Sequence, residues 1–251
     1  MPNELNYTID FLSYEWIRNN LVAFIIIFLL IYIAKKNTRN YKFSLLFPYF
    51  IGSFLLFRVF AIQWYHYKIG IWDIAISLPF HLCSYSSILS GVTLLIVNNK
   101  TINFKLKQLL FNFMFFWGLA GFYAFLTPQY TAGIQGYLYY DYYVSHGGFI
   151  FAIIYLIIIH DYKPSFNSYY YIFMYSQVVL VVVHFINYII GPPSNYMYTM
   201  FTPVANNPFV IGEPPLHIIL INIFAFIHFY FFYKIFYKIY NYRNNVTSIN
   251  K

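Results

Sequence analysis

The sequence predicts an all-α, polytopic membrane protein with seven transmembrane helices in a single domain, residues 1–251. Two observations support this fold class. Charged residues make up only 9% of the chain and hydrophobic residues 61%, whereas a soluble globular domain contains roughly 25% charged residues. In addition, seven apolar segments approach the length of about 20 residues that a helix needs to cross a bilayer. Both observations indicate an integral membrane protein.

The seven predicted spans are 15–34, 43–65, 79–97, 106–126, 147–160, 168–190 and 216–239. An acidic segment precedes the first span, unlike the positive start of a cleavable signal, so we expect this span to be retained. Pro79 suits the first turn of the third helix, which would then include His81 and Cys83. The fifth span is short and must take residues from its flanks. Segments 127–145 and 191–215 show no helical pattern and are expected to be loops.

Basic residues are distributed unevenly among the loops. They cluster in 35–42, in 100–107, at Lys163 and in the tail after the seventh span, whereas the loops of the opposite side contain only Lys68. Because Lys and Arg collect in cytoplasmic loops, we expect an outer N-terminus, a cytoplasmic C-terminus and a multi-pass protein of the cell membrane. This bias also explains the net charge of +8. Without a basic face or a binding motif, no nucleic acid partner is expected.

The reactive side chains gather at the predicted outer face. Cys83, the only cysteine of the chain, and His81 begin the third span, and His146 begins the fifth. Residues two apart on a helix point in nearly opposite directions, so His81 is a poor base for Cys83, and His146 is the natural partner. A Cys–His pair would provide an activated thiolate for acyl transfer. The alternative is an inert, buried cysteine that packs as a small hydrophobic residue.

Polar residues inside the predicted spans form a second group of candidates. Arg58 lies within the second span, where an arginine is a functional candidate by default; it could hold a lipid phosphate or a carboxylate, or reach toward the interface. Gln177, His184 and Asn187 form a polar stripe in the sixth span. Such a stripe lines a site in some membrane proteins and makes interhelical hydrogen bonds in others.

Four short motifs occur in a characteristic order: Leu78-Pro79-Phe80-His81-Leu82-Cys83, Ser145-His146-Gly147-Gly148, Ser194-Asn195-Tyr196-Met197-Tyr198 and Ile211-Gly212-Glu213-Pro214-Pro215. Their order and spacing resemble the YwaF-like bacterial integral membrane family, which is related to eukaryotic transmembrane protein 164. The resemblance extends over roughly residues 20–240 and includes the seven-span layout.

This resemblance implies a seven-helix, acyltransferase-like fold. In the eukaryotic relative, a cysteine and a histidine are regarded as a catalytic pair that moves a fatty acyl chain between phospholipids. Cys83 and His146 would occupy these two places, and His81 would be the histidine that precedes the cysteine. One departure is visible, because Gly-Glu-Pro-Pro-Leu-His replaces the expected Gly-Pro-Trp-Pro-Tyr and introduces His217. The third outer loop is therefore expected to differ in its substrate contacts.

The leading hypothesis is a thiol-dependent phospholipid acyltransferase that acts at the outer leaflet without a cofactor. Cys83 would attack the ester carbonyl, His146 would accept the thiol proton, and Arg58, or Lys68 at the interface, would bind the lipid phosphate. Asn195 or backbone donors of the last outer loop would stabilise the oxyanion. The remaining predicted substrate-binding residues are Tyr196, His184 and Asn187. Membrane phospholipids are the expected partners.

Two other functions stay open at this point. A binding or transport protein would use Arg58 and the polar stripe as a midplane site, although the spans lack the broken-helix pairs of many transporters. A zinc-dependent membrane hydrolase would draw its ligands from the outer face, where His81, Cys83, Asp141, His146 and His217 are available. No pair of these residues has the spacing of a helical zinc motif, so no metal site is expected.

Overall fold

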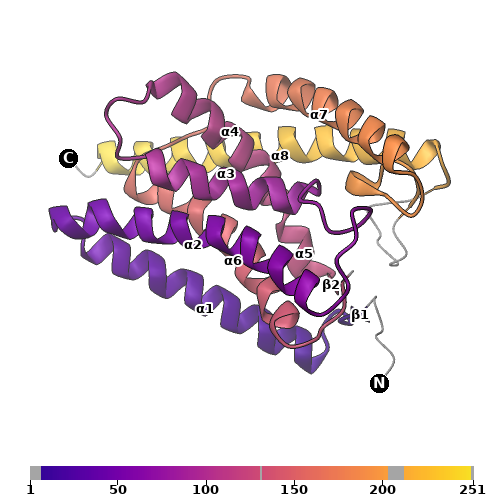
Figure 1. The fold of residues 1–251 in the computed structure, drawn as a ribbon. Coiled ribbons are helices and arrows are strands. Elements are labelled where there is room, and N and C mark those ends of the chain that lie inside the picture. Colours follow the sequence, from indigo (N-terminus) through magenta and orange to yellow (C-terminus); the bar gives the residue numbers. More distant parts are fainter. Residues whose placement is uncertain (1–6, 131, 203–211, 250–251) are drawn as a thin grey trace.

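The computed structural model describes residues 7–130, 132–202 and 212–249 (Figure 1). In chain order the elements are β1 (Tyr7–Thr8), α1 (Tyr14–Lys36), α2 (Tyr41–Lys68), α3 (Leu82–Ile96), α4 (Phe104–Ala120), α5 (Phe122–Leu126), β2 (Gln129–Tyr130), α6 (Tyr137–Ile159), α7 (Ser168–Ile190), the 3₁₀ helix η1 (Tyr196–Tyr198) and α8 (Leu216–Ile249). The only β-structure in the described ranges is the two-residue antiparallel pairing of β1 with β2.

Among the residues that the structure describes, six helical segments are long and apolar enough to cross a membrane. They are Tyr14–Lys36, Tyr41–Lys68, Phe104–Leu126, Tyr137–Ile159, Ser168–Ile190 and Leu216–Tyr242. The apolar helix α3 has only 15 residues, which correspond to about 22 Å at 1.5 Å per residue. This length is shorter than the hydrocarbon core of about 30 Å. The predicted class of a helical, multi-pass membrane protein is confirmed.

Two predicted boundaries are wrong. Helix α3 begins at Leu82, because His81 has extended backbone angles (φ −80°, ψ 152°) and precedes the helix as its N-cap residue; Pro79 and His81 therefore do not belong to the helix. Helix α6 begins at Tyr137, ten residues before the predicted start of the fifth span. Its first turns are rich in tyrosine, which hydropathy scales rank as only weakly apolar, and the helix start was therefore not predicted. About half of the predicted loop 127–145 is helical. Residues 131 and 203–211 of the two predicted loops lie outside the described residues.

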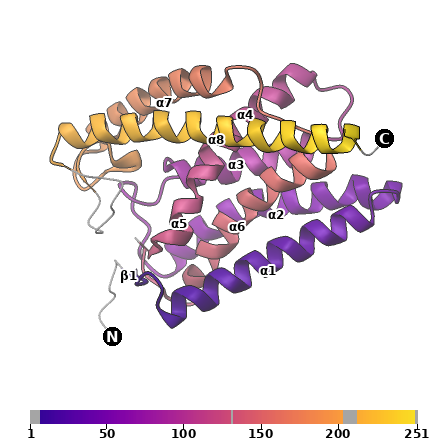
Figure 2. The same cartoon turned by 180° about the vertical axis from the view of Figure 1, so that it is seen from behind.

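Helices α3, α4 and α6 form the centre of the bundle (Figure 1). Helices α1 and α2 cover one side, and α7 and α8 cover the other, as both views show (Figure 2). The central helices are the most buried because they contact neighbours on several sides. Their fully buried side chains include Phe111, Met114, Phe116, Phe149, Ala152 and Leu156. These side chains form the apolar core against which the site is built.

Two glycines bring α2 and α3 into close contact. A Cβ atom at Gly52 would lie only 2.7 Å from the carbonyl oxygen of Gly91. Small residues let membrane helices approach each other in this way. The close approach places Arg58, less than two turns further along α2, beside the polar face of α3.

The start of α1 is attached to the end of the bundle that contains Cys83. The Trp16 indole Nε1–H donates to the Leu126 carbonyl oxygen at 3.1 Å, and the Asn20 amide donates to the Phe125 carbonyl oxygen at 3.0 Å. Before the helix, β1 pairs with β2, and the Tyr7 hydroxyl donates to the Glu15 carboxylate at 2.8 Å. These contacts hold the start of α1 against α5 and β2, and the α5 residue Phe125 lies beside His146.

Candidate active site

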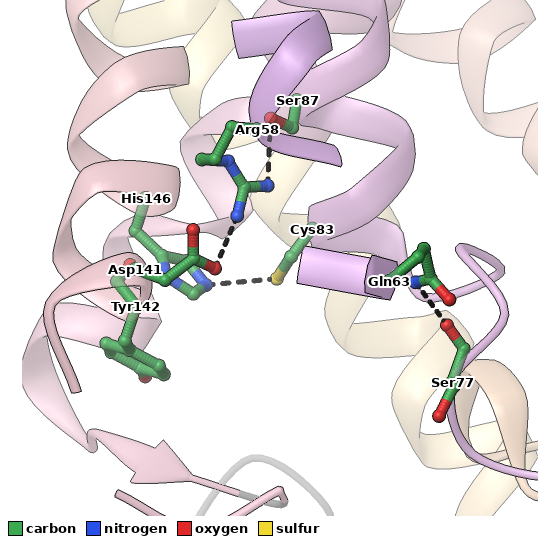
Figure 3. A network of polar contacts seen from close by, with 8 residues as sticks. All are labelled: Arg58, Gln63, Ser77, Cys83, Ser87, Asp141, Tyr142 and His146. Atoms are coloured by element: carbon green, nitrogen blue, oxygen red, sulfur yellow. Dashed lines mark hydrogen bonds and ion pairs between the residues drawn. The ribbon is translucent and has the colours of Figure 1, made fainter. Parts of the chain in front are cut away.

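The structure brings Cys83 and His146 together. Cys83 lies in the first turn of α3, and His146 lies on the facing side of α6 (Figure 3). The His146 Nε2 atom is 3.2 Å from the Cys83 Sγ atom. The imidazole is buried, and the cysteine is partly buried. A thiol and a base at this distance have the geometry of an activated nucleophile.

A backbone carbonyl determines which nitrogen of His146 carries hydrogen. The His146 Nδ1 atom lies 2.7 Å from the carbonyl oxygen of Tyr142, one turn earlier in α6. Because a carbonyl oxygen only accepts hydrogen bonds, Nδ1 must donate, and the neutral ring then has its lone pair on Nε2. This lone pair faces the Cys83 thiol. The nucleophile, the base and a group that orients the base are therefore all present.

Aromatic rings surround the His146 imidazole. Its ring centroid lies 4.4 Å from that of Tyr142, 5.4 Å from that of Phe149 and 6.4 Å from that of Phe125. The Tyr142 hydroxyl is itself held, because it donates to the Ala124 carbonyl oxygen at 2.9 Å. These rings restrict the orientation of the imidazole and keep water from its faces.

His81 faces the loop that follows α7. Its ring centroid lies 5.2 Å from that of Tyr196 and 5.8 Å from that of Tyr198. His81 therefore packs beneath the segment 194–201, which we call the cover loop. This location agrees with the expectation that His81 is not the base for Cys83. The expected reason was that the two side chains point in opposite directions on one helix, whereas in the structure His81 precedes α3.

Asn187 organises the cover loop. Its fully buried amide donates to the Tyr196 carbonyl oxygen at 2.9 Å and to Thr199 Oγ1 at 2.8 Å. Its Oδ1 atom accepts from Ser194 Oγ at 2.7 Å and from the Tyr196 backbone N–H at 2.9 Å. His184 adds a hydrogen bond to the Thr199 carbonyl oxygen. Two residues of the predicted polar stripe thus hold the cover loop in place.

The other predicted binding residues of the cover loop also bond within the protein. Asn195 closes its own turn, because its amide donates to the Phe201 carbonyl oxygen at 2.7 Å. The Tyr196 hydroxyl donates to the Ile74 carbonyl oxygen and accepts from the Leu78 N–H, at 2.7 and 2.9 Å. Tyr196 therefore connects the cover loop to the segment that leads into α3.

Tyr198 is the cover-loop residue whose ring centroid lies 5.8 Å from that of His81, two residues before Cys83. Burial, with a smaller contribution from the nearby Cys83 thiol, raises the pKa of Tyr198 to about 12. Its phenol group is therefore protonated at neutral pH and can donate a hydrogen bond. His217 supports this residue from α8, because its Nε2–H donates to the Tyr198 carbonyl oxygen at 2.9 Å.

Arg58 forms a buried ion pair next to the Cys–His pair (Figure 3). Its Nη1 atom lies 2.5 Å from Asp141 Oδ2, and its Nη2 atom donates to Ser87 Oγ at 3.2 Å. Only 5% of Arg58 is exposed. The sequence predicted that Arg58 would bind a lipid phosphate; in the structure both terminal nitrogens contact groups of the protein itself.

Comparison with known proteins shows to which family the chain belongs. The model of the TMEM164 family matches residues 11–233. The chain belongs to the TMEM164 family. The match extends from the segment before α1 into α8 and so includes Cys83, His146 and the cover loop. No curated protein and no solved structure matches the chain.

Three contributors to the site of this TMEM164 family member escaped the sequence reasoning. Asp141 was expected in a loop, where it was considered as a possible zinc ligand, and neither Ser87 nor the Tyr142 carbonyl was predicted as a group of the site. A signal existed for Asp141, because an arginine within the membrane needs a carboxylate or carbonyl partner. A second signal existed for Tyr142, which precedes His146 by one helical turn.

The candidate zinc ligands do not converge. Within the described ranges, no three His, Cys, Asp or Glu side chains lie together in a group that could hold a metal ion. His217, one of the residues considered, is engaged with the cover loop.

Proposed function

We propose that this protein is a thiol-dependent phospholipid acyltransferase. One observation supports the proposal above all others: Cys83 Sγ lies 3.2 Å from His146 Nε2, while the Tyr142 carbonyl holds the opposite nitrogen of the ring. A thiol that serves only as a small packing residue does not require an oriented base. Membership of the TMEM164 family agrees with a membrane setting for this chemistry.

The reaction proceeds in two balanced halves. Nε2 of His146 takes the thiol proton as Cys83 Sγ forms a bond to the ester carbonyl carbon of a phospholipid. The tetrahedral intermediate collapses, the ester C–O bond breaks, and the leaving lysolipid oxygen receives the proton from His146. An acceptor hydroxyl then transfers its proton to His146 and attacks the thioester carbonyl carbon; the C–S bond breaks, and the leaving Cys83 thiolate takes the proton from His146. No electron transfer and no cofactor are required.

The negative oxygen of the intermediate needs a hydrogen-bond donor. Asn195 or backbone donors of the last outer loop were expected in this role, but the Asn195 amide donates within the cover loop. Tyr198 is the better candidate, because its hydroxyl is protonated at neutral pH and its ring lies beside His81, two residues before Cys83. The cover loop thus contributes to the reaction through Tyr198, while Asn187 and His184 keep the loop in place.

The proposal includes a topology. We propose that α3 is a seventh, short crossing segment and that the Cys83 end of the bundle faces the outer leaflet of the cell membrane. The distribution of basic residues supports this orientation, and the burial of α3 among α2, α4 and α6 explains how a short helix can exist at membrane depth. Assignment to the YwaF-like bacterial branch of the family stays a prediction from the four sequence motifs.

The test uses the purified protein in nanodiscs with a phospholipid labelled in one acyl chain and an unlabelled lysophospholipid acceptor. The wild type is expected to transfer the label and to form a hydroxylamine-sensitive acyl adduct on Cys83. Cys83→Ala should form no adduct, and His146→Gln should transfer about 10²- to 10⁴-fold more slowly, since the base is lost.

His160→Gln is the matched control. His160 ends the same helix as His146, about 21 Å further along its axis at 1.5 Å per residue. This variant should transfer acyl chains at the wild-type rate. Full lipid turnover by Cys83→Ala would refute the thioester mechanism, as would a wild-type protein that forms no adduct with any diacyl phospholipid.

A further inference from the structure

Arg58 connects the two helices that carry the Cys–His pair. It belongs to α2, yet its Nη1 atom contacts Asp141 on α6 and its Nη2 atom donates to Ser87 on α3 (Figure 3). Cys83 and His146 connect the same two helices, α3 and α6. The guanidinium group is therefore a second link between the elements that position the nucleophile and the base.

The two links are close together along both helices. Ser87 follows Cys83 by four residues, one turn of α3, so the two side chains share a face of this helix. Asp141 precedes His146 by five residues, about 7.5 Å along α6. A shift or rotation of α3 against α6 that separated Cys83 from His146 would therefore also break the contacts of Arg58.

Stability alone does not explain this ion pair. Charged groups are costly within a membrane segment, and replacement of a buried ion pair by apolar residues of similar volume is often neutral or stabilising. Arginine does, however, present a planar set of donors in a fixed geometry. This rigid fork can define the separation of two helices more closely than apolar packing can.

We propose that Arg58 is a positioning residue whose contacts with Asp141 and Ser87 hold Cys83 Sγ within reach of His146 Nε2. The inference rests on the proposed acyl transfer, and it replaces the expectation that Arg58 binds the lipid phosphate. Arg58 acts through the two helices and does not touch the substrate. Its loss should therefore slow the chemical step and leave phospholipid binding unchanged.

The principal variant is the double replacement Arg58→Met with Asp141→Leu, which removes both charges and leaves no unpaired ion. Its kcat for acyl transfer should fall roughly 10- to 100-fold, because small displacements of reacting groups have effects of this size. The KM for phospholipid should stay at the wild-type value. A higher KM with an unchanged kcat would show that Arg58 binds phosphate and would overturn the inference.

Two further variants separate positioning from folding. Ser87→Ala removes only one contact of Arg58 and should lower kcat in the same direction by a smaller factor. Thr93→Val is the matched control, because the Thr93 hydroxyl is fully buried in α3 but bonds to the Leu89 carbonyl of its own helix. This control should retain the wild-type kcat. Equal losses in both variants would mean that any polar change in α3 disturbs the site, and the inference would be wrong.

A second measurement does not depend on acyl transfer. Alkylation of Cys83 by iodoacetamide in the folded protein reports how well His146 activates the thiol. The rate should fall in His146→Gln and by a similar factor in the Arg58→Met, Asp141→Leu double variant. Equal alkylation rates in the wild type and the double variant would refute the role of Arg58. A wild type without an acyl adduct would instead refute the proposed function while this comparison still tested the positioning.

Discussion

The clearest quantitative prediction concerns Asn187, the residue that holds the cover loop. The perturbation is Asn187→Ala, which removes four hydrogen bonds of 2.7–2.9 Å from a fully buried position. Each intramolecular hydrogen bond contributes about 1 kcal/mol net. The folded protein should therefore lose about 4 kcal/mol of stability, a large share of the total for a single domain.

Two assays measure this loss. At about 2–4 °C per kcal/mol for a chain of this size, the Tm of the protein in nanodiscs should fall by roughly 10 °C. Limited proteolysis should also begin in the cover loop, because local opening there no longer breaks these buried hydrogen bonds. Acyl transfer should decrease with the loss of order at Tyr198, even at temperatures where the helices remain folded.

Asn222→Ala is the matched control for Asn187. Asn222 also lies in a membrane helix, but in the part of the chain that the structure describes its amide donates to the Ile218 carbonyl oxygen of its own helix, at 2.8 Å. This variant should change the Tm by less than about 3 °C. If Asn187→Ala and Asn222→Ala had the same Tm and the same pattern of proteolysis, the cover loop would not depend on Asn187 and the reasoning would fail.

Two further predictions concern the ends of the bundle. Lys107→Met should destabilise the protein by about 3 kcal/mol, because the buried Lys107 Nζ donates to two carbonyl oxygens at the end of α3; thermal unfolding should show the loss, whereas the exposed Lys105→Met should show none. The hydrogen bond to Glu15, with burial, raises the pKa of Tyr7 to about 12, above its ordinary value of about 10. Since the folded state keeps this proton longer, the Tyr7 contribution to stability is full below pH ~10 and is lost as pH rises toward 12. The difference in Tm between the wild type and Tyr7→Phe should shrink over this range, and a constant difference would contradict the assignment.

Hydropathy was sufficient to recognise most of the helices but not their ends. The predicted spans 168–190 and 216–239 agree closely with α7 and the first part of α8, because a long apolar run can be recognised from hydropathy alone. The start of α6 was missed because its first turns are largely tyrosine, which packs against other tyrosines at the end of the bundle. The end of α3 nearest Cys83 was missed because the contacts of His81 with the cover loop depend on residues more than 100 positions away.

For the candidate site, the sequence by itself determined which reactive side chains are available. It provided a single cysteine, a small number of histidines and Arg58 within the second predicted span, and it gave His146 as the expected partner of Cys83. These conclusions rest on local spacing and on the properties of residue types, which can be read without a fold.

Only the tertiary structure decided which groups touch. The contact of Cys83 with His146 joins residues 63 positions apart, and that of Arg58 with Asp141 joins residues 83 positions apart. Neither distance is encoded in a helical period, because it depends on how far each helix is rotated and displaced against its neighbours. Close approach at Gly52 and Gly91 and the aromatic packing around α6 determine those rotations. They placed the thiol beside a base and gave Arg58 a carboxylate within the protein.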